Sequence, residues 1–127
     1  MGRNHYEWGN QHLSLLALHQ VSQIGTLDIR QLWQRTGEQQ LLCAPIGLQR
    51  GGPLLLDLKE PATGGYGPHG LVVGATGSGK TELLRTIVTS LSLTHNPFLL
   101  NFVLVTSAGG TAFAAFEKLS QIREALD

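Results

Sequence analysis

Cysteine and charged residues are both scarce in this sequence. Cys43 is the single cysteine, so the chain has no internal disulfide and no thiolate zinc site built from cysteine alone. A chain of this kind fits a reducing compartment, and we expect a cytoplasmic protein. Charged residues make up 14% of the 127 residues, and the nine basic and nine acidic side chains give zero net charge. This balance gives no general attraction to nucleic acid or to an anionic membrane surface.

Long apolar runs are also missing. No stretch reaches the ~18 apolar residues that a membrane-spanning helix needs, because the apolar run at residues 99–105 is short and contains Asn101. The first residues lack the basic and then apolar pattern of a secretory signal. If the protein acts at the inner face of a membrane, we expect partners to bring it there. The 42% of apolar residues is enough for the core of one domain.

Residues 1–40 are predicted to form a helical lead segment ahead of the main domain, which covers residues 41–127. A first short helix is indicated by apolar residues at helical spacing, Leu13, Leu16 and Ala17. A second short helix is predicted over residues 26–35, with Thr26 as its N-cap.

Three histidines in the lead segment, His5, His12 and His19, recur every seven residues. On one helix, neighbours at this spacing lie about 10 Å apart along the axis, which is too far for one metal ion to bridge. We therefore expect a solvated helix face and not a metal site. Trp33 is predicted to be a packing residue, and Cys43 a small buried apolar residue.

The next segment predicts a β-hairpin. Residues 41–48 and 54–58 have the composition of two strands, and Gly51, Gly52 and Pro53 between them are a strong turn signal. Residues 61–68 are rich in glycine and proline and are predicted to form a loop.

From residue 70 the pattern is typical of an α/β protein. Residues 71–73 predict a short buried strand, and an amphipathic helix is predicted to begin near Lys80. The near-continuous apolar run at residues 99–105 predicts a strand in a sheet that is covered on both faces. Apolar residues at three-residue spacing predict a final helix over residues 113–127. Strand, helix, strand and helix in this order favour a parallel sheet with flanking helices.

The turn between the first predicted strand and its helix matches the phosphate-binding pattern G-x-x-x-x-G-K-[ST]. Its residues are Gly74, Ala75, Thr76, Gly77, Ser78, Gly79, Lys80 and Thr81. Glycines at these positions allow backbone N–H groups to approach an anion, and the helix start adds unpaired N–H groups and a partial positive charge. Lys80 is predicted to reach the β- and γ-phosphates of a nucleotide, and the Thr81 hydroxyl to ligate magnesium.

This match is specific. A chance occurrence is expected in roughly 1 of 200 chains of this length. Here an apolar run precedes the pattern and an amphipathic helix follows it, as the phosphate loop requires. The alternative is a glycine-rich turn before a Lys-Thr helix start, with no ligand.

Residues 66–86, YGPHGLVVGATGSGKTELLRT, closely resemble the FtsK/SpoIIIE group of motor ATPases. Within that group the sequence most resembles the membrane-associated ATPase of bacterial type VII secretion, near its first motor domain. The resemblance covers roughly residues 24–119, and its specific parts are the glycine-lysine-threonine core and the Gly-Pro-His-Gly lead. It does not extend to the first twenty residues.

The resemblance implies a partial RecA-like P-loop NTPase domain, preceded by the short helical segment and the hairpin. It also implies ATP and Mg²⁺ as cofactors and a ring of six subunits that moves DNA or secreted proteins. It assigns phosphate-binding roles to Gly74, Gly77, Ser78, Gly79, Lys80 and Thr81.

Two departures from the family pattern stand out. Where the family often has Val-Asp-Phe-Lys-Gly-Gly, residues 105–110 are Val-Thr-Ser-Ala-Gly-Gly. The family's Walker B strand, which carries the acids for hydrolysis, would lie beyond Asp127, so no catalytic residue is assigned. We expect the front part of a motor domain, from a truncated or decayed gene. Its strands would pair differently, be marginally stable or need a partner, since the strands that normally lie between them are missing.

Three functions follow as hypotheses. The first is an ATP-binding domain related to type VII secretion motors, without full hydrolysis machinery and with other ATPase subunits or secretion components as partners. The second is a fragment of a DNA translocase, although the neutral charge does not favour DNA as a partner. The third is a non-catalytic module that binds a partner ATPase through an exposed sheet edge.

Overall fold

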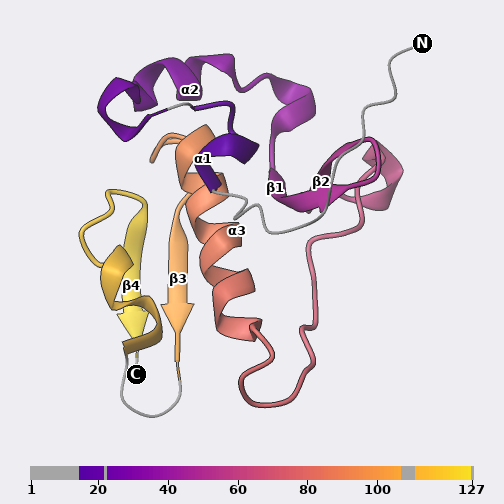
Figure 1. The fold of residues 1–127 in the computed structure, drawn as a ribbon, viewed down its shortest axis with the longest axis vertical. Helices are drawn as coiled ribbons and strands as arrows, with labels where there is room; N and C mark the ends of the chain where they lie inside the picture. Colours follow the sequence, from indigo (N-terminus) through magenta and orange to yellow (C-terminus); the bar gives the residue numbers. More distant parts are fainter. Residues whose placement is uncertain (1–14, 22, 107–110, 127) are drawn as a thin grey trace.

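The computed structural model describes residues 15–21, 23–106 and 111–126 (Figure 1). Along the chain its elements are α1 (Leu15–Leu18), η1 (Ile24–Thr26), α2 (Ile29–Arg35), η2 (Glu38–Gln40), β1 (Cys43–Gln49), β2 (Gly52–Asp57), η3 (Pro61–Thr63), α3 (Lys80–Thr94), β3 (Phe102–Val105), η4 (Thr111–Phe116) and β4 (Ile122–Leu126). The elements labelled η are 3-10 helices. No helix in the described part of the chain has the length and hydropathy needed to cross a bilayer.

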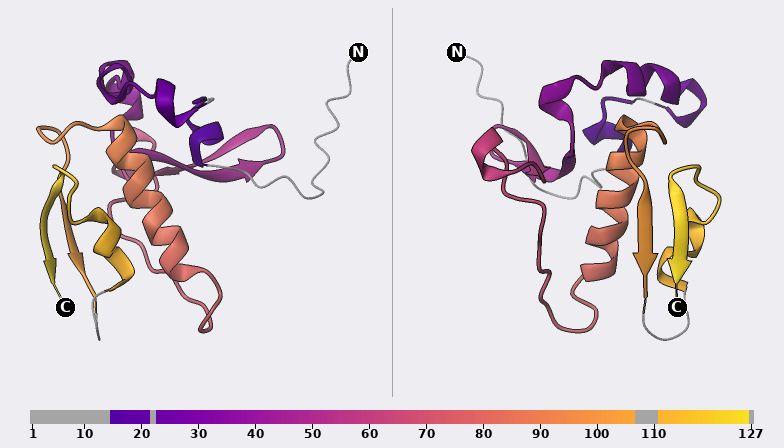
Figure 2. Two further views of the ribbon diagram at one scale, coloured as in Figure 1. Left: turned by 60° about the vertical axis from the view of Figure 1, so that its left-hand side comes forward. Right: turned by 180° about the vertical axis from the view of Figure 1, so that it is seen from behind.

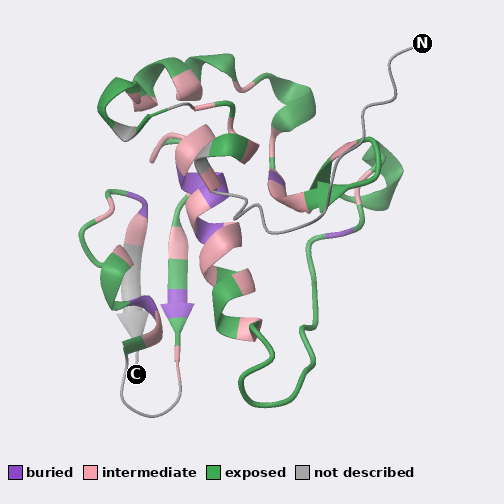
Figure 3. Cartoon of the chain, viewed as in Figure 1, coloured by how far each residue is buried: buried purple, intermediate pink, exposed green. Residues whose placement is uncertain are grey.

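Helix α3 is the element around which the others are arranged (Figures 1 and 2). The strands β3 and β4 lie along one side of it, the β1–β2 hairpin lies on another, and α2 crosses its C-terminal end. Buried residues are concentrated on α3 and on the elements that face it (Figure 3). Val88 of α3, Leu104 of β3 and Phe113 of η4 form the described hydrophobic core, so the three elements are held together by one small cluster.

The predicted hairpin and the predicted helix from Lys80 are both confirmed. β1 and β2 pair antiparallel from Cys43 opposite Asp57 to Gln49 opposite Gly52, with a bulge near Pro45. Their turn uses Gly51 and Gly52 at φ of 104° and 145°, a backbone region that glycine enters without steric cost.

The predicted helix over residues 113–127 is wrong. The chain forms the short 3-10 helix η4, and then β4, which pairs in parallel with β3. The three-residue apolar spacing fits a 3-10 helix, which has three residues per turn. Residues 122–126 become a strand because they supply β3 with backbone hydrogen bonds along one edge.

The predicted buried strand at residues 71–73 is also wrong. These residues are extended but belong to neither described sheet, and Leu71 and Val73 are more than four-fifths exposed. The expectation that residues 99–105 form a strand covered on both faces fails as well, because Val103 and Val105 of β3 are exposed. The described fold is therefore α/β with a hairpin and one parallel strand pair, and the described residues form no RecA-like sheet.

The N-cap of α2 is Asp28 and not Thr26 as predicted. One Asp28 carboxylate oxygen accepts from the N–H groups of Arg30, at 3.0 Å, and Gln31, at 3.3 Å. The Thr26 hydroxyl instead donates to the carbonyl of Gln23 within η1. Aspartate satisfies two otherwise unpaired helix donors, which places the start of the helix after it.

The C-terminal carbonyls of α3 are bonded by side chains from distant parts of the chain. Trp33 Nε1 donates to the Ser92 carbonyl at 3.0 Å, and the Thr36 hydroxyl donates to the Thr94 carbonyl. Gln121, just before β4, donates through Nε2 to the carbonyls of Ser92 and His95. The last four carbonyls of a helix have no partner within it, so these bonds fix α2 and the β4 connection to this end of α3.

Two histidines, His95 buried and His19 half-buried, bond to the C-terminal half of α3. His95 Nε2 accepts from the N–H of Leu42 at 3.1 Å, so in the neutral ring Nδ1 carries the proton and faces the Leu91 carbonyl. His19 Nε2 bonds to the Ser90 hydroxyl at 3.1 Å, and that hydroxyl donates to the Pro45 carbonyl. The solvated face predicted for the seven-residue histidine repeat is therefore wrong for His19.

Three further sequence predictions concern His5 and His12, Trp33, and Cys43. His5 and His12 lie outside the described residues. Trp33, predicted to be a packing residue, is half-buried and donates through Nε1 to the Ser92 carbonyl. Cys43 is half-buried, and its burial, followed by the nearby Asp57 carboxylate, raises the pKa of its thiol.

We predict that acid destabilises the fold. Burial lowers the pKa of His19 and of His95, so the unfolded chain binds protons at these sites more readily than the folded chain. Their contribution is complete above the unfolded pKa, and the unfolding free energy should fall as the pH drops below about 6.5. Urea unfolding at pH 7.5 and 5.5 measures this change. Equal or greater stability at pH 5.5 would contradict the assignment.

Candidate phosphate-binding site

The loop of residues 74–79 leads directly into α3. Residues 71–79 are all exposed, so the loop and the segment before it are open to solvent. Figure 1 shows the arrowheads of β3 and β4 at the same end of the molecule as the start of α3. In α/β folds, ligands bind at the carboxyl ends of parallel strands, and the loop lies at that edge.

The backbone favours glycine at two positions of the loop, and a third glycine lies close to a side chain. Gly77 and Gly79 have φ of 78° and 96°, a left-handed backbone that other residues rarely adopt. A Cβ added to Gly74 would lie 2.5 Å from Ser78 Oγ, because the loop turns back on itself there. The turn is closed by the N–H of Ser78, which donates to the Ala75 carbonyl at 3.1 Å.

Lys80 closes the loop from inside. Its ammonium group donates to the carbonyls of Gly74 and Ala75, both at 2.7 Å. The backbone of the loop therefore curves around the lysine Nζ. The positive charge is held at the loop by two neutral carbonyls and, within the described residues, by no carboxylate.

The start of α3 offers unpaired donors beside this ammonium. Gly79 is the N-cap but has no side chain, and the first helical hydrogen bond runs from the N–H of Leu83 to the Gly79 carbonyl. The N–H groups of Lys80, Thr81 and Glu82 precede that bond and lack helical partners. Together with the helix dipole they make this end of α3 attractive to an anion.

The Thr81 hydroxyl differs from the hydroxyls further along α3. Those of Thr86, Thr89 and Thr94 each donate to the carbonyl four residues earlier, at 2.8 to 3.0 Å. The Thr81 hydroxyl makes no such bond with the described residues, since the carbonyl four residues earlier belongs to the loop and not to the helix. The Thr81 hydroxyl therefore remains available to a ligand where the loop meets the helix.

The sequence did not reveal a contact that lies one turn further along α3. The Arg85 Nη1 bonds to Glu82 Oε1 at 2.5 Å, and its Nε donates to the Ala112 carbonyl of η4 at 2.6 Å. The three-residue spacing of the opposite charges could have predicted the ion pair. Nothing local could have predicted the bond to η4, which joins residues 27 positions apart.

The residues present fit a polyphosphate. Two left-handed glycines, one ammonium and a helix start without a side-chain cap are all gathered in residues 74–81. For a metal, the described residues contain no group of three or more His, Cys, Asp or Glu placed to hold one. A magnesium ion here would depend on the Thr81 hydroxyl and on oxygens of the phosphates themselves, as this ion usually does.

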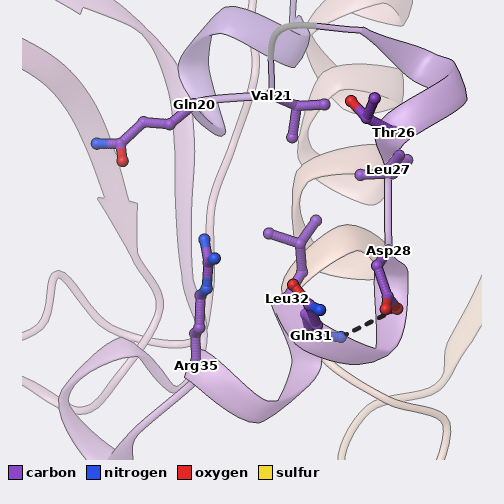
Figure 4. A pocket seen from close by; sticks show the side chains of 8 residues that line it. All are labelled: Gln20, Val21, Thr26, Leu27, Asp28, Gln31, Leu32 and Arg35. Carbon is purple, nitrogen blue, oxygen red and sulfur yellow. Dashed lines mark hydrogen bonds between the residues drawn. The ribbon is translucent and has the colours of Figure 1, made fainter.

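Two hollows lie away from the loop. One cavity of about 130 Å³ is formed by residues 20–21, η1 and α2, and its walls include Asp28 and Arg35 (Figure 4). The Asp28 carboxylate in it is engaged in capping α2. The other, of about 390 Å³, lies between Trp33 and Phe98. Neither is bordered by residues 74–81.

Comparisons with known proteins agree on one family. The sequence profile of the FtsK/SpoIIIE family matches residues 27–126. The ESX secretion system protein EccC of Thermomonospora curvata is 48% identical over 112 residues, which is 87% of this chain and 8% of that protein. The ESX-4 secretion system protein EccC4 of Mycobacterium tuberculosis is 44% identical over 94 residues, 73% of this chain and 8% of that protein.

A solved structure is similar as well. The cytoplasmic domain of the T. curvata type VII secretion ATPase EccC superposes with a TM-score of 0.84 at 45% identity, over 93% of this chain and 14% of that one. The chain therefore spans about a twelfth of the length of these curated relatives, and about a seventh of the solved chain.

We predict that Gly79→Ala lowers the unfolding free energy by about 1–2 kcal/mol, the cost of forcing a side chain into the left-handed region. Gly70→Ala is the matched control, because a Cβ at Gly70 meets no atom within 4 Å and its φ is not in that region. Chemical denaturation of both variants measures the difference. Equal stabilities would show that the loop does not need the left-handed backbone at position 79.

Proposed function

This chain belongs to the FtsK/SpoIIIE family and is related to the EccC ATPases of type VII secretion, and from this premise we propose that residues 74–81 bind the triphosphate of ATP with magnesium. One observation carries the proposal. The loop curves around Lys80 Nζ, which contacts the carbonyls of Gly74 and Ala75 at the free N-terminus of α3. A positive charge, unpaired N–H groups and a glycine backbone in one turn match what a polyphosphate requires.

Each part of the loop has a separate task in this proposal. The backbone around Gly77 and Gly79 brings N–H groups to the phosphate oxygens. Lys80 exchanges its loop carbonyls for phosphate oxygens, which are the stronger partners because they are charged. The Thr81 hydroxyl holds magnesium, which neutralises phosphate charge when it is bound. The exposed helix start adds its dipole at the same point.

The proposal also covers the domain and the lead segment as a whole. Residues 41–127 form the N-terminal part of an ATPase domain, and residues 1–40 are its lead, which contacts α3 through Trp33 and Thr36. The exposed apolar residues at 71–73 and on β3 support a RecA-like sheet in which further strands cover them. The EccC relationship supports a role on the cytoplasmic side of a secretion machine, in which partners bring the domain to the membrane.

Rapid hydrolysis is not part of the proposal for residues 1–127. Hydrolysis requires a residue that orients the attacking water. Glu82, the described carboxylate nearest to the loop in the sequence, is paired with Arg85, Asp57 is paired with Lys59, and Asp28 caps α2, while Glu38, Glu60 and Glu117 lie outside the loop and α3. DNA translocation is the less favoured alternative, since the net charge is zero.

We predict that ATP with Mg²⁺ binds to the polypeptide of residues 1–127 and that Lys80→Ala weakens binding by about tenfold or more, because the variant lacks the ammonium at the phosphates. Isothermal titration calorimetry measures both affinities. Lys118→Ala is the control, since Lys118 is an exposed lysine outside the loop and its loss should leave the affinity unchanged. No binding heat from the unmodified chain would reject the proposal.

We also predict that the same polypeptide hydrolyses ATP at a rate close to the uncatalysed background. Phosphate release in the presence of Mg²⁺ measures this rate. A turnover on the order of 1 per second, within the ordinary range of enzymes, would show that a carboxylate of residues 1–127 does activate water.

A further inference from the structure

The guanidinium of Arg85 joins two elements that meet at the candidate site. Nε donates to the Ala112 carbonyl of η4 at 2.6 Å, while Nη1 bonds to Glu82 Oε1 at 2.5 Å. Glu82 is the third residue of α3 and immediately follows Thr81. Through one side chain, the first turn of the phosphate-binding helix is therefore connected to the segment that follows β3.

The 3-10 helix η4 is fixed at a second point. Phe113, next to Ala112, is buried with Val88 of α3 and Leu104 of β3. Figure 2 shows η4 beside the N-terminal half of α3 in its left view. The apolar contact sets where η4 lies, and the Arg85 bond sets where its first residues lie relative to the start of α3.

Arginine is suited to this connection and lysine is not. Arginine carries donors in fixed and different directions on one plane, so it can bond to a carbonyl and a carboxylate at once. Its side chain is 37% exposed here, while that of Glu82 is 73% exposed. An ion pair this open contributes little to stability, so the more protected contact is the bond to the Ala112 carbonyl.

We propose that Arg85 is a positioning residue for nucleotide binding, which holds η4 against the first turns of α3 and so keeps Lys80 and Thr81 in their binding arrangement. This inference rests on the proposed function. Arg85 acts through its bond to η4 and does not touch the phosphates. Glu82 is dispensable for this role, because its carboxylate adds negative charge close to a site for an anion.

Four variants separate this role from simple stabilisation of the fold. Arg85→Ala removes both bonds. Arg85→Lys keeps the positive charge but lacks the planar set of donors that point in different directions. Glu82→Gln removes the ion pair and leaves the bond to Ala112. Leu91→Ala opens a cavity in a different part of the packing of α3, since Leu91 is buried but does not belong to the cluster that holds η4. Calorimetric titration with ATP and Mg²⁺ is performed well below the unfolding temperature of each variant, with hydrogen exchange of residues 111–116 as a second readout.

The proposal expects the dissociation constant for ATP to be tenfold higher in both Arg85→Ala and Arg85→Lys, with faster hydrogen exchange in residues 111–116. It expects an affinity equal to or higher than that of the unmodified chain in Glu82→Gln, and an unchanged affinity in Leu91→Ala.

Three results would overturn it while leaving the proposed function intact. These are an unchanged affinity in Arg85→Ala, a full rescue by Arg85→Lys, or a loss in Glu82→Gln as large as that in Arg85→Ala. An equal loss in Leu91→Ala would reduce Arg85 to a general stabilising role and would also overturn the proposal. If the unmodified chain binds no nucleotide, the proposed function and this inference both fail.

Discussion

The two ends of α3 differ in whether other parts of the chain bond to their backbone groups, and the rest of the structure depends on that difference. At the C-terminal end the carbonyls are bonded by Trp33 and Thr36 from α2 and its C-cap, and by Gln121 just before β4. At the N-terminal end the cap is Gly79, which has no side chain to bond the first N–H groups. A helix whose carbonyls are occupied and whose amides are free is a fixed support with a positively polarised, open end.

Positive charge and free backbone amides come together at this open end, while the chain as a whole carries no net charge. With zero net charge, the protein has no broad field to attract a partner. Lys80 places a full positive charge where the helix amides are free, and neutral carbonyls hold it there without cancelling it. At the other end of α3, burial lowers the pKa of His19 and of His95, which disfavours their positively charged forms there. The chain thus directs its attraction for anions to one turn.

Local signals predicted the parts of the fold that local physics decides. The hairpin followed from Gly51 and Gly52, and α3 from its apolar spacing and the glycine loop before it. Long-range contacts decided the remainder. Residues 71–73 are not a strand because no described strand pairs with them, and β4 is a strand because it pairs with β3. For the candidate site, the eight loop residues were readable as a motif, but the Arg85 bond to η4 was not, since it depends on how η4 packs.

The central claim is that free backbone amides at the start of α3, with the Lys80 ammonium, hold a triphosphate. Amide nitrogen–proton chemical shifts recorded while ATP and Mg²⁺ are added test it residue by residue. The account predicts large, saturable shifts confined mainly to residues 77–83, with the amides at the C-terminal end of α3 nearly unchanged. Shifts that avoid this stretch, or that are no larger there than elsewhere at saturation, would contradict it.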